Sequence, residues 1–324
     1  MKVLANDGIS EDGKKKLEEA GFEVNTEKVS QDELANAINE NEYVALLVRS
    51  ATKVRKELID QCPGLKFIGR GGVGLDNIDV EHAESKGITV VNTPAAPSQS
   101  VAELIMGHLF NVARFIHDAN KQMPEKGVDE FKTLKKKYAK GAELRGKTLG
   151  VVGFGRIGQY TAKYALGCGM KVIYHDPFVE NANINLEIEG ADNVEVKLTS
   201  TSFDDVITNS DFISLNVPKQ KDGSAVVGDN EINKMKEGVA LINASRGGVI
   251  DEGALLKALD SGKVGHVALD VFENEPTPKK ELLQHEKVSL TPHIGASTVE
   301  AQNRIGVELA DKIIEVLDAK PVGS

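Results

Sequence analysis

The segment LGVVGFGRIGQYTAKYALGCGMKVIYHD, residues 149–176, constrains the fold more strongly than any other part of the sequence. It places Gly153, Gly155 and Gly158 in a G-x-G-x-x-G pattern between an apolar strand and a helical pattern, and a second apolar run follows. In that context the first glycine permits a tight turn, the second lets backbone N–H groups approach a pyrophosphate, and the third lets the helix pack against the strand. The segment favours a βαβ unit that binds a dinucleotide over a glycine-rich turn without one.

Strand and helix patterns alternate along the rest of the chain as well. The expected strands before this segment are KVLA, FEVN, YVALLV, LKFIG and ITVVN, and those after it are DFISLNVP, VALINAS, HVALDVF and KVSLTPH. Charged amphipathic stretches separate them, which is typical of parallel strands joined by crossover helices. We therefore expect an α/β chain with two Rossmann-like, doubly wound parallel sheets.

A chain of 324 residues is long enough for two domains with separate cores. A long helix is expected to begin near the segment SQSVAEL, which starts at Ser98. Ser100 and Glu103 have the S-x-x-E spacing of a capping box, and His108 is interpreted as a packing residue on the apolar face of the helix. Charge dominates between residues 121 and 147, before the second series of strands. The last amphipathic stretch, residues 298–317, could return to cover the first domain.

Asp176 ends the second strand of the dinucleotide motif, where a carboxylate would accept hydrogen bonds from an adenosine ribose. Because its charge would oppose a 2′-phosphate, we predict NAD rather than NADP. The predicted cofactor contacts are Gly153, Gly155, Arg156, Ile157, Gly158, Asp176, Pro218, Ala244, Asp270, His293 and Gly295.

Three ionisable residues follow predicted strands of the second series: Arg246, Glu275 and His293. Carboxyl ends of parallel strands meet at one edge of a sheet, so we expect these side chains to converge. A histidine can take the hydroxyl proton during hydride transfer, a carboxylate can fix its tautomer, and a guanidinium can hold an α-carboxylate in two hydrogen bonds. Each residue alone also fits a structural role, but together, beside a nucleotide motif, they favour catalysis. Asp270 is expected to contact the nicotinamide carboxamide.

A second glycine-rich turn, GRGGVGLDNIDV, occupies residues 69–80. Backbone N–H groups around Gly72, Val73 and Gly74 could form an anion-binding nest for a substrate carboxylate. A tight βα turn that needs glycine for steric reasons explains the same pattern equally well.

Composition excludes several partners. The 39 Lys and Arg residues are outnumbered by 49 Asp and Glu, so the surface offers no general attraction to nucleic acid or anionic lipid. No apolar run is long enough to span a membrane, and histidines and cysteines lack metal-ligand spacing, so no metal site is expected. Cys62 and Cys168 occur without a secretory segment, which favours the reducing cytoplasm.

The motifs VRSATKV, GRGGVGLDNID, GFGRIG, NASRGGVIDEGALLKAL, ALDVFENEP and PHIGAST together resemble the D-2-hydroxyacid dehydrogenase family, from about Tyr43 to the C-terminal helix. The resemblance implies a substrate-binding domain of residues 1–97 and 296–324, with an NAD-binding Rossmann domain of residues 98–295 inserted, and a cleft that closes on substrate. It also implies the arginine, glutamate and histidine set named above and a homodimer. The chain resembles the short members without a serine-sensing regulatory domain.

Within the family, the resemblance is greatest to members whose substrate is a small phosphorylated hydroxy acid. The expected substrate contacts are Arg49, Ser50, Arg70, Gly72, Val73, Gly74, Lys136 and Arg246. The resemblance implies that the phosphate lies near Arg49, Ser50, Arg70 and Lys136. For the lysine run around Lys136, a solvated helix face is an open alternative. Two other functions remain possible: a dehydrogenase of an unphosphorylated hydroxy acid, and a dinucleotide-sensing corepressor-like binding protein on the same scaffold.

Overall fold

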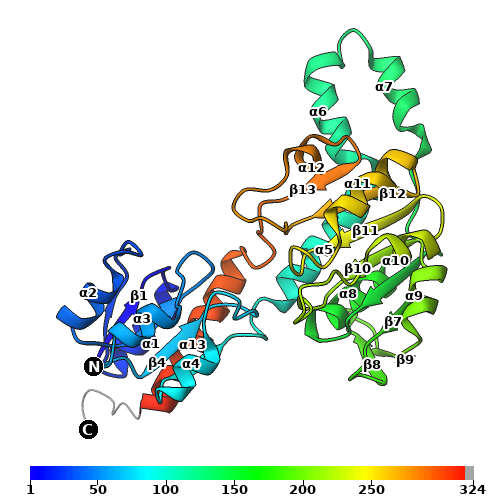
Figure 1. The fold of residues 1–324 in the computed structure, drawn as a ribbon. Coiled ribbons are helices and arrows are strands. Elements are labelled where there is room, and N and C mark those ends of the chain that lie inside the picture. The colour runs from blue at the N-terminus through cyan, green and yellow to red at the C-terminus, as the bar shows by residue number, and fades with distance from the viewer. Residues whose placement is uncertain (318–324) are drawn as a thin grey trace. The chain divides into compact units, whose positions relative to one another are not determined.

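The computed structural model describes residues 1–317 and contains two compact units (Figure 1). Unit 1 is Met1–Ser100 with Ala296–Ser324, and unit 2 is Val101–Gly295. Residues 318–324, which belong to the first domain expected from the sequence, lie outside the described residues. Each unit has its own parallel sheet with helices on both faces, so the predicted α/β doubly wound fold is confirmed.

The sheet of unit 1 has five parallel strands in the order β2-β1-β3-β4-β5. The strands are β1 (Lys2–Ala5), β2 (Glu23–Asn25), β3 (Tyr43–Val48), β4 (Phe67–Arg70) and β5 (Thr89–Asn92). Successive side chains of a strand point to opposite faces. Leu46 and Leu47 accordingly belong to two different apolar clusters, one on each face of the sheet.

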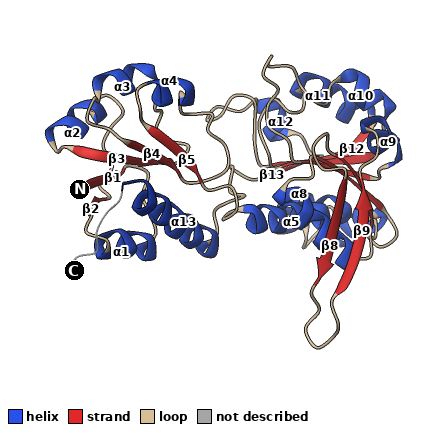
Figure 2. Ribbon diagram, turned by 90° about the horizontal axis from the view of Figure 1, so that it is seen from below, coloured by secondary structure: helices blue, strands red, loops and turns tan. Residues whose placement is uncertain are grey.

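Five helices cover the two faces of this sheet, as Figure 2 shows. Helices α2 (Leu34–Glu40), α3 (Lys56–Gln61) and α4 (Val80–Ser85) lie on one face, and α1 (Glu11–Glu19) and α13 (Val299–Leu317) lie on the other. The predicted return of the last amphipathic stretch onto the first domain is therefore confirmed, because buried Ala310 and Ile313 of α13 pack in the same cluster as Leu17 of α1.

The two helices α1 and α13 approach closely at a pair of glycines. A Cβ atom added at Gly13 would lie 2.5 Å from the carbonyl carbon and oxygen of Gly306. Ser10 caps α1 through its hydroxyl, which accepts a hydrogen bond from the Gly13 N–H at 3.2 Å, and the same hydroxyl contacts the Asn303 carbonyl of α13 at 3.4 Å. Because Gly13 and Gly306 have no side chains, α1 and α13, which come from the two ends of the chain, can pack closely in one unit.

The main sheet of unit 2 has six parallel strands in the order β13-β12-β11-β10-β6-β7. They are β6 (Thr148–Val152), β7 (Lys171–His175), β10 (Phe212–Leu215), β11 (Val239–Asn243), β12 (Val264–Leu269) and β13 (Val288–Leu290). The chain runs outward from β6 to β7 and then returns to β10 on the other side of β6. This reversal is the topological switch point where open α/β sheets bind ligands.

Helices of unit 2 also form two layers. One layer holds α5 (Ser98–Arg114), which extends from unit 1, and α8 (Arg156–Gly167), and the other holds α9 (Phe203–Asn209), α10 (Asp229–Lys234), α11 (Glu252–Ser261) and α12 (Lys280–Gln284) (Figure 2). The charged stretch between the two series of strands folds into α6 (Ile116–Lys126), α7 (Phe131–Lys137) and the 3-10 turn Tyr138–Lys140. Figure 1 shows α6 and α7 as a pair that projects from unit 2.

The hairpin after β7 and the start of α5 differ from the sequence analysis. An antiparallel hairpin of β8 (Asn181–Leu186) and β9 (Val194–Thr199) follows β7 and was not expected, although its residues alternate in burial. The capping box at Ser100 is wrong, because α5 begins at Ser98 and the Ser100 hydroxyl pairs with that of Thr298 at 2.8 Å. Tertiary contacts of the hydroxyl have replaced the local cap.

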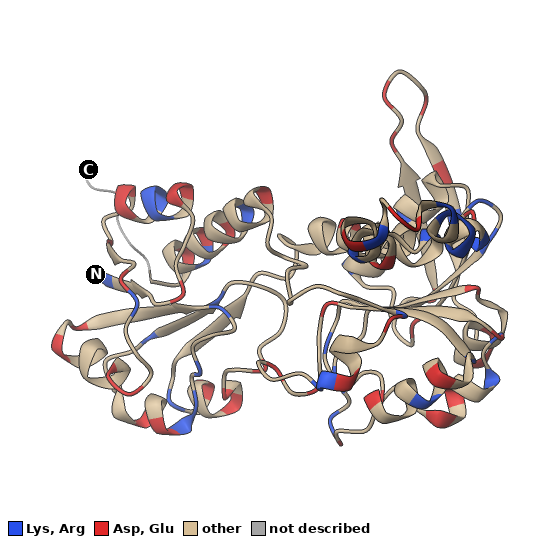
Figure 3. Ribbon diagram, turned by 90° about the horizontal axis from the view of Figure 1, so that it is seen from above, with Lys and Arg blue, Asp and Glu red and all other residues tan. Residues whose placement is uncertain are grey.

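Charged residues of both signs are interspersed over the helices, as Figure 3 shows. Within the part of the chain that the structure describes, no helix combines the length and the apolar character that crossing a membrane requires.

We predict that Gly13→Ala destabilises unit 1 by about 1–3 kcal/mol, because the added methyl group would overlap the Gly306 backbone. Urea denaturation followed by hydrogen exchange of the β1 and β3 amides measures the change. Gly107→Ala on α5 is the matched control, since no atom lies within 4 Å of its added Cβ and helix propensity then favours alanine by roughly 0.5–1 kcal/mol. Equal stability of the Gly13 variant and the unmodified protein would disprove the close contact.

Candidate active site

The glycine-rich loop of unit 2 has the geometry that a dinucleotide requires. It joins β6 to α8, and Gly153 has a φ of 88° with the Asn216 carbonyl oxygen 2.5 Å from the place of a Cβ. Gly158 packs on the loop itself, because a Cβ there would lie 2.3 Å from the Gly153 carbonyl oxygen. No atom lies within 4 Å of a Cβ on Gly155, the N-cap of α8, and no side chain caps this helix. The positive end of α8 and the space above Gly155 therefore suit a pyrophosphate.

Asp176 follows β7 directly and lies beside this loop. One carboxylate oxygen accepts the Phe154 N–H at 2.6 Å, and the other accepts the N–H groups of Phe178 and Val179 at 2.8 and 3.1 Å. The carboxylate thus joins the glycine-rich loop to the turn after β7, at the position expected for a ribose contact. Pro218, also a predicted cofactor residue, is exposed and follows Val217, whose side chain borders Gly153.

Asp270 follows β12 and is 1% exposed. Its Oδ1 accepts the Thr291 hydroxyl at 2.6 Å and the Ile294 N–H at 2.8 Å, and its Oδ2 accepts the Gly295 N–H at 2.9 Å. These bonds tie the end of β12 to the turn that follows β13. Ala244, another predicted cofactor residue, follows the adjacent strand β11 and is half-buried.

His293 lies in that turn, with a positive φ of 55° that is uncommon for a residue with a side chain. Its Nδ1 is 2.8 Å from Glu275 Oε2, and the other oxygen of Glu275 accepts the Phe272 N–H at 3.0 Å. A neutral imidazole with Nδ1–H donated to a carboxylate has Nε2 as a proton acceptor. Among residues 1–317, Nε2 has no hydrogen-bond partner, and the side chain is 40% exposed.

Electrostatics link Arg246 to the same pair. Burial raises the pKa of Glu275, but the hydrogen bond and charge of His293, the Phe272 N–H and the charge of Arg246 together outweigh burial and hold the pKa below its usual value. Arg246 follows β11, and its guanidinium donates to the Ser245 carbonyl at 2.6 Å. The structure therefore brings together the three residues that the sequence placed at the ends of separate strands.

This arrangement can exchange a proton and bind an anion in one place. Nε2 of His293 can take a proton from a hydroxyl group or return it, and Glu275 stabilises the resulting imidazolium. The guanidinium of Arg246 is a donor to a carboxylate. All of these groups, together with the glycine-rich loop, belong to unit 2.

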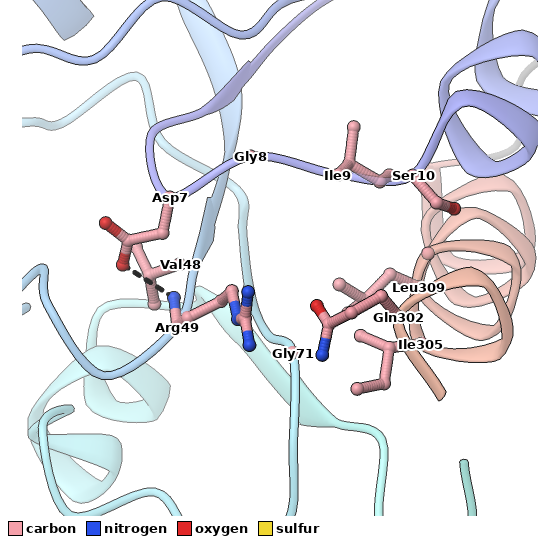
Figure 4. A pocket seen from close by; sticks show the side chains of 11 residues that line it. Asp7, Gly8, Ile9, Ser10, Val48, Arg49, Gly71, Gln302, Ile305 and Leu309 are labelled. Atoms are coloured by element: carbon pink, nitrogen blue, oxygen red, sulfur yellow. Dashed lines mark hydrogen bonds between the residues drawn. The ribbon is translucent and has the colours of Figure 1, made fainter. Parts of the chain in front are cut away.

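Unit 1 has its own hollow of about 210 Å³ at the carboxyl ends of β1 and β3 (Figure 4). Arg49 lines it together with Asp7 and Gln302 of α13, and Ile305 and Leu309 form an apolar wall. In Figure 4 the guanidinium of Arg49 and the amide of Gln302 point toward the same space. Sequence reasoning missed Gln302, because nothing local places α13 beside β3.

Asp7 is the second residue that the sequence analysis missed, although it lies only two residues after the end of β1. Its side chain is 4% exposed and accepts the Arg49 N–H at 2.7 Å, the Thr52 N–H at 3.0 Å and the Thr52 hydroxyl at 2.8 Å, and Lys28 pairs with it. Burial raises the pKa of Asp7, but the hydrogen bonds from Lys28, Arg49 and Thr52 outweigh burial and lower the pKa below 3.8. Asp7 therefore holds the VRSAT loop in shape.

The second glycine-rich turn in unit 1 fits the nest interpretation only in part. The Gly72 N–H donates to the Thr93 hydroxyl at 2.8 Å, so it is not available to a ligand. Within residues 1–317, the N–H groups of Val73 and Gly74 have no acceptor. Ser50 is exposed, Arg70 is half-buried, and Lys136 is exposed on α7 in unit 2. Their contacts with substrate remain predictions.

Comparison with known proteins identifies the family. The family model described as "D-isomer specific 2-hydroxyacid dehydrogenase, NAD binding domain" matches residues 106–295. The chain belongs to the D-isomer specific 2-hydroxyacid dehydrogenase family. It is therefore an NAD-dependent dehydrogenase, and the glycine-rich loop with the open space at Gly155 fits this cofactor.

Relatives within the dehydrogenase family differ in substrate. The chain is 44% identical to a hydroxypyruvate reductase of Thermotoga maritima over 98% of both chains. It is 41% identical to a D-3-phosphoglycerate dehydrogenase of Archaeoglobus fulgidus over 99% of its own length but only 58% of the relative's. A crystal structure of NAD⁺-bound 3-phosphoglycerate dehydrogenase from Entamoeba histolytica superposes with a TM-score of 0.76 at 27% identity, over 98% of this chain and 95% of that one.

We predict that Asp7→Asn lowers the stability of unit 1 at pH 7 by about 1–2 kcal/mol, because the charge-assisted bonds to the VRSAT loop weaken. A lowered folded-state pKa means that this contribution is complete above the ordinary value of 3.8 and is lost as the pH falls through the folded-state pKa. The stability difference between the two proteins should therefore shrink below about pH 4. Thermal unfolding between pH 3 and 7 measures it, with exposed Asp32→Asn as control. A difference independent of pH would contradict the ionic role.

Proposed function

We propose that this dehydrogenase interconverts 3-phospho-D-glycerate and 3-phosphohydroxypyruvate, the first step of phosphorylated serine biosynthesis. The observation that carries the reaction type is the His293 Nδ1 to Glu275 Oε2 contact of 2.8 Å beside Arg246 and the nucleotide loop. Several relatives named D-3-phosphoglycerate dehydrogenase support the substrate.

The catalytic roles follow from the chemistry of the three side chains. Arg246 binds the α-carboxylate, and His293 Nε2 takes the proton of the C2 hydroxyl group while Glu275 stabilises the imidazolium. The glycine-rich loop after β6 would hold NAD, and this cofactor would supply the hydride acceptor for C2. In the reverse direction His293 returns the proton to the carbonyl oxygen. Asp270 holds the turn that carries His293 and would contact the nicotinamide carboxamide.

The proposed NAD-binding domain is residues 98–295, which includes all of unit 2. Residues 1–97 and 296–324 would form the substrate-binding domain. The proposed cofactor contacts are those expected from the sequence, and Asp176 favours NAD over NADP because of its charge. A wild-type protein that prefers NADP in steady-state kinetics would contradict this role of Asp176.

The hollow of unit 1 supports a phosphorylated substrate. Arg49 is a cation on its wall, Gln302 adds an amide, and Asp7 fixes the loop that carries Arg49. Arg70, Ser50 and the N–H groups of Val73 and Gly74 would complete the substrate contacts in this unit. For Lys136 we keep a phosphate contact as the weaker part of the proposal.

Hydroxypyruvate reduction is the second candidate, and one observation favours it: the hydroxypyruvate reductase of Thermotoga maritima matches both chains over 98% of their length. The two functions differ only in the phosphate. The ratio of kcat/KM for 3-phosphohydroxypyruvate to that for hydroxypyruvate separates them, measured beside glyoxylate, pyruvate and 2-oxoglutarate. Faster turnover of hydroxypyruvate would overturn the first candidate, and no turnover of any 2-oxo acid would favour a corepressor-like binding protein.

A homodimer that associates through the nucleotide-binding units is also proposed. Large apolar side chains are exposed on the projecting α6–α7 pair: Ile116 (51%), Met123 (42%), Val128 (95%) and Phe131 (56%). A cluster of this kind on a projecting element is typical of a subunit interface. A monomer mass in sedimentation velocity would contradict it.

Cys62 and Cys168 are unpaired, which supports a cytoplasmic location that cell fractionation can check.

We predict that His293→Ala lowers kcat by roughly a hundredfold to ten-thousandfold, the usual contribution of one acid-base group. Binding of NADH, measured by fluorescence titration, should change little because the glycine-rich loop is intact. His82→Ala is the matched control, since His82 pairs with Asp60 at 2.9 Å on the surface of unit 1. Loss of less than about tenfold would reduce His293 to a structural residue.

We predict that Arg49→Gln raises KM for 3-phosphohydroxypyruvate by roughly tenfold to a hundredfold, as the loss of a hydrogen bond to a charged group implies. KM for hydroxypyruvate should change less than threefold. Arg55→Gln serves as control, because Arg55 pairs with Asp79 in the same unit and is not part of the hollow. Equal effects of the Arg49 variant on both substrates would rule out the phosphate contact.

A further inference from the structure

A chain of polar side chains runs through the interior of unit 2 and ends on Asp270. Asn111 Nδ2 donates to the Ser289 hydroxyl at 2.7 Å, and this hydroxyl lies 3.4 Å from His108 Nδ1. His108 Nε2 lies 3.0 Å from the Thr291 hydroxyl, which donates to Asp270 Oδ1 at 2.6 Å. Helix α5 is thus linked through the Thr291 hydroxyl to the carboxylate that holds the His293 turn, although His108 and Thr291 are 183 residues apart in sequence.

The direction of every hydrogen bond in this chain can be assigned. Asp270, as a carboxylate, only accepts, so the single proton of the Thr291 hydroxyl points to it and Thr291 must accept from His108 Nε2–H. His108 Nδ1 is then an acceptor for the Ser289 hydroxyl. The His117 N–H donates to Asn111 Oδ1 at 2.7 Å, which leaves the Asn111 amide nitrogen to face Ser289.

Burial makes the hydrogen-bonded side chains depend on one another. Ser289 is 1% exposed and His108 is 3% exposed. Burial lowers the pKa of His108, the negative charge of Asp270 raises it, and the net shift is downward, which keeps the ring neutral with one donor and one acceptor. Buried polar groups without partners are costly, so the removal of one member leaves both of its neighbours unsatisfied.

Asp270, at the end of this chain of hydrogen bonds, holds part of the candidate active site. Asp270 shares Oδ1 between Thr291 and the Ile294 N–H, and its Oδ2 accepts the Gly295 N–H. The two N–H groups directly follow His293, whose positive φ needs such restraint. A shift of the Asp270 carboxylate would therefore shift the histidine.

We propose that His108 and Thr291 are positioning residues, which hold Asp270 and through it the His293 turn in the arrangement that hydride transfer needs. This inference rests on the proposed role of His293. Their side chains act on the reaction through Asp270, and the backbone bond from the His293 N–H to the Thr291 carbonyl at 3.1 Å does not depend on either side chain.

Thr291→Val and Thr291→Ser test the proposal. Valine keeps the shape but removes the hydroxyl, and kcat should fall about tenfold, the scale of a small misplacement of reacting groups. Serine restores the hydroxyl and should keep kcat within about twofold of the unmodified protein. Binding of ADP-ribose, which lacks nicotinamide, should be unchanged in both. Thr161→Val is the control, because this buried threonine of α8 donates only to the Ile157 carbonyl.

An unchanged kcat in Thr291→Val, an equal loss in Thr291→Ser, or an equal loss in Thr161→Val would overturn the proposal. His108→Leu provides the second arm and should also lower kcat about tenfold. The double variant His108→Leu/Thr291→Val should lose no more activity than the worse single variant, because one chain is broken in each case. Losses that multiply would show two independent effects. If the His108 variant does not fold, the Thr291 pair still decides the question.

Failure of the proposed function is distinguishable from failure of this inference. If the unmodified protein turns over no 2-oxo acid, or if His293→Ala keeps its activity, the proposed function is wrong. The hydrogen bonds of His108 can then be tested independently of activity by ¹⁵N NMR of the histidine rings. The His108 signals should report the Nε2–H tautomer and should change in Thr291→Val but not in Thr161→Val.

Discussion

Parallel pairing of the strands is the constraint on which the rest of this protein depends. It sends every carboxyl end of a sheet to the same edge, and crossover helices then return each chain segment to the opposite edge. In unit 2 this places the glycine-rich loop, Arg246, Asp270 and the His293 turn on one side of the sheet, although they come from four different strands. Unit 1 repeats the arrangement, with Asp7 and Arg49 after β1 and β3.

The same device fixes the loops at both of these edges. An aspartate within two residues of the end of a strand accepts backbone N–H groups from a neighbouring loop, as Asp7, Asp176 and Asp270 each do. Carboxylates can accept several N–H groups at once, so a single side chain fixes a turn that has no regular hydrogen bonds of its own. The candidate catalytic histidine and the candidate phosphate-binding arginine are thereby both held by aspartates rather than by helices or strands.

Prediction from the sequence succeeded where the physics is local or follows from parallel pairing. The glycine pattern between a strand and a helix predicted the loop after β6, and the strand-end rule predicted that Arg246, Glu275 and His293 meet. It failed at Ser100, whose hydroxyl bonds Thr298 instead of capping α5. The hairpin of β8 and β9 was missed although Gly190, with a φ of 79°, lies in the loop that joins its two strands and its residues alternate in burial.

The sequence by itself determined the class of fold, the dinucleotide loop and the chemical types available at the strand ends, because backbone geometry and burial periodicity act over a few neighbouring residues. Only the tertiary structure decided which distant side chains share a site. Gln302 reaches the Arg49 hollow because α13 packs on α1, and His108 reaches Thr291 because α5 lies beside the end of β13. Such contacts depend on the order of strands and the packing of helices, which no local pattern encodes.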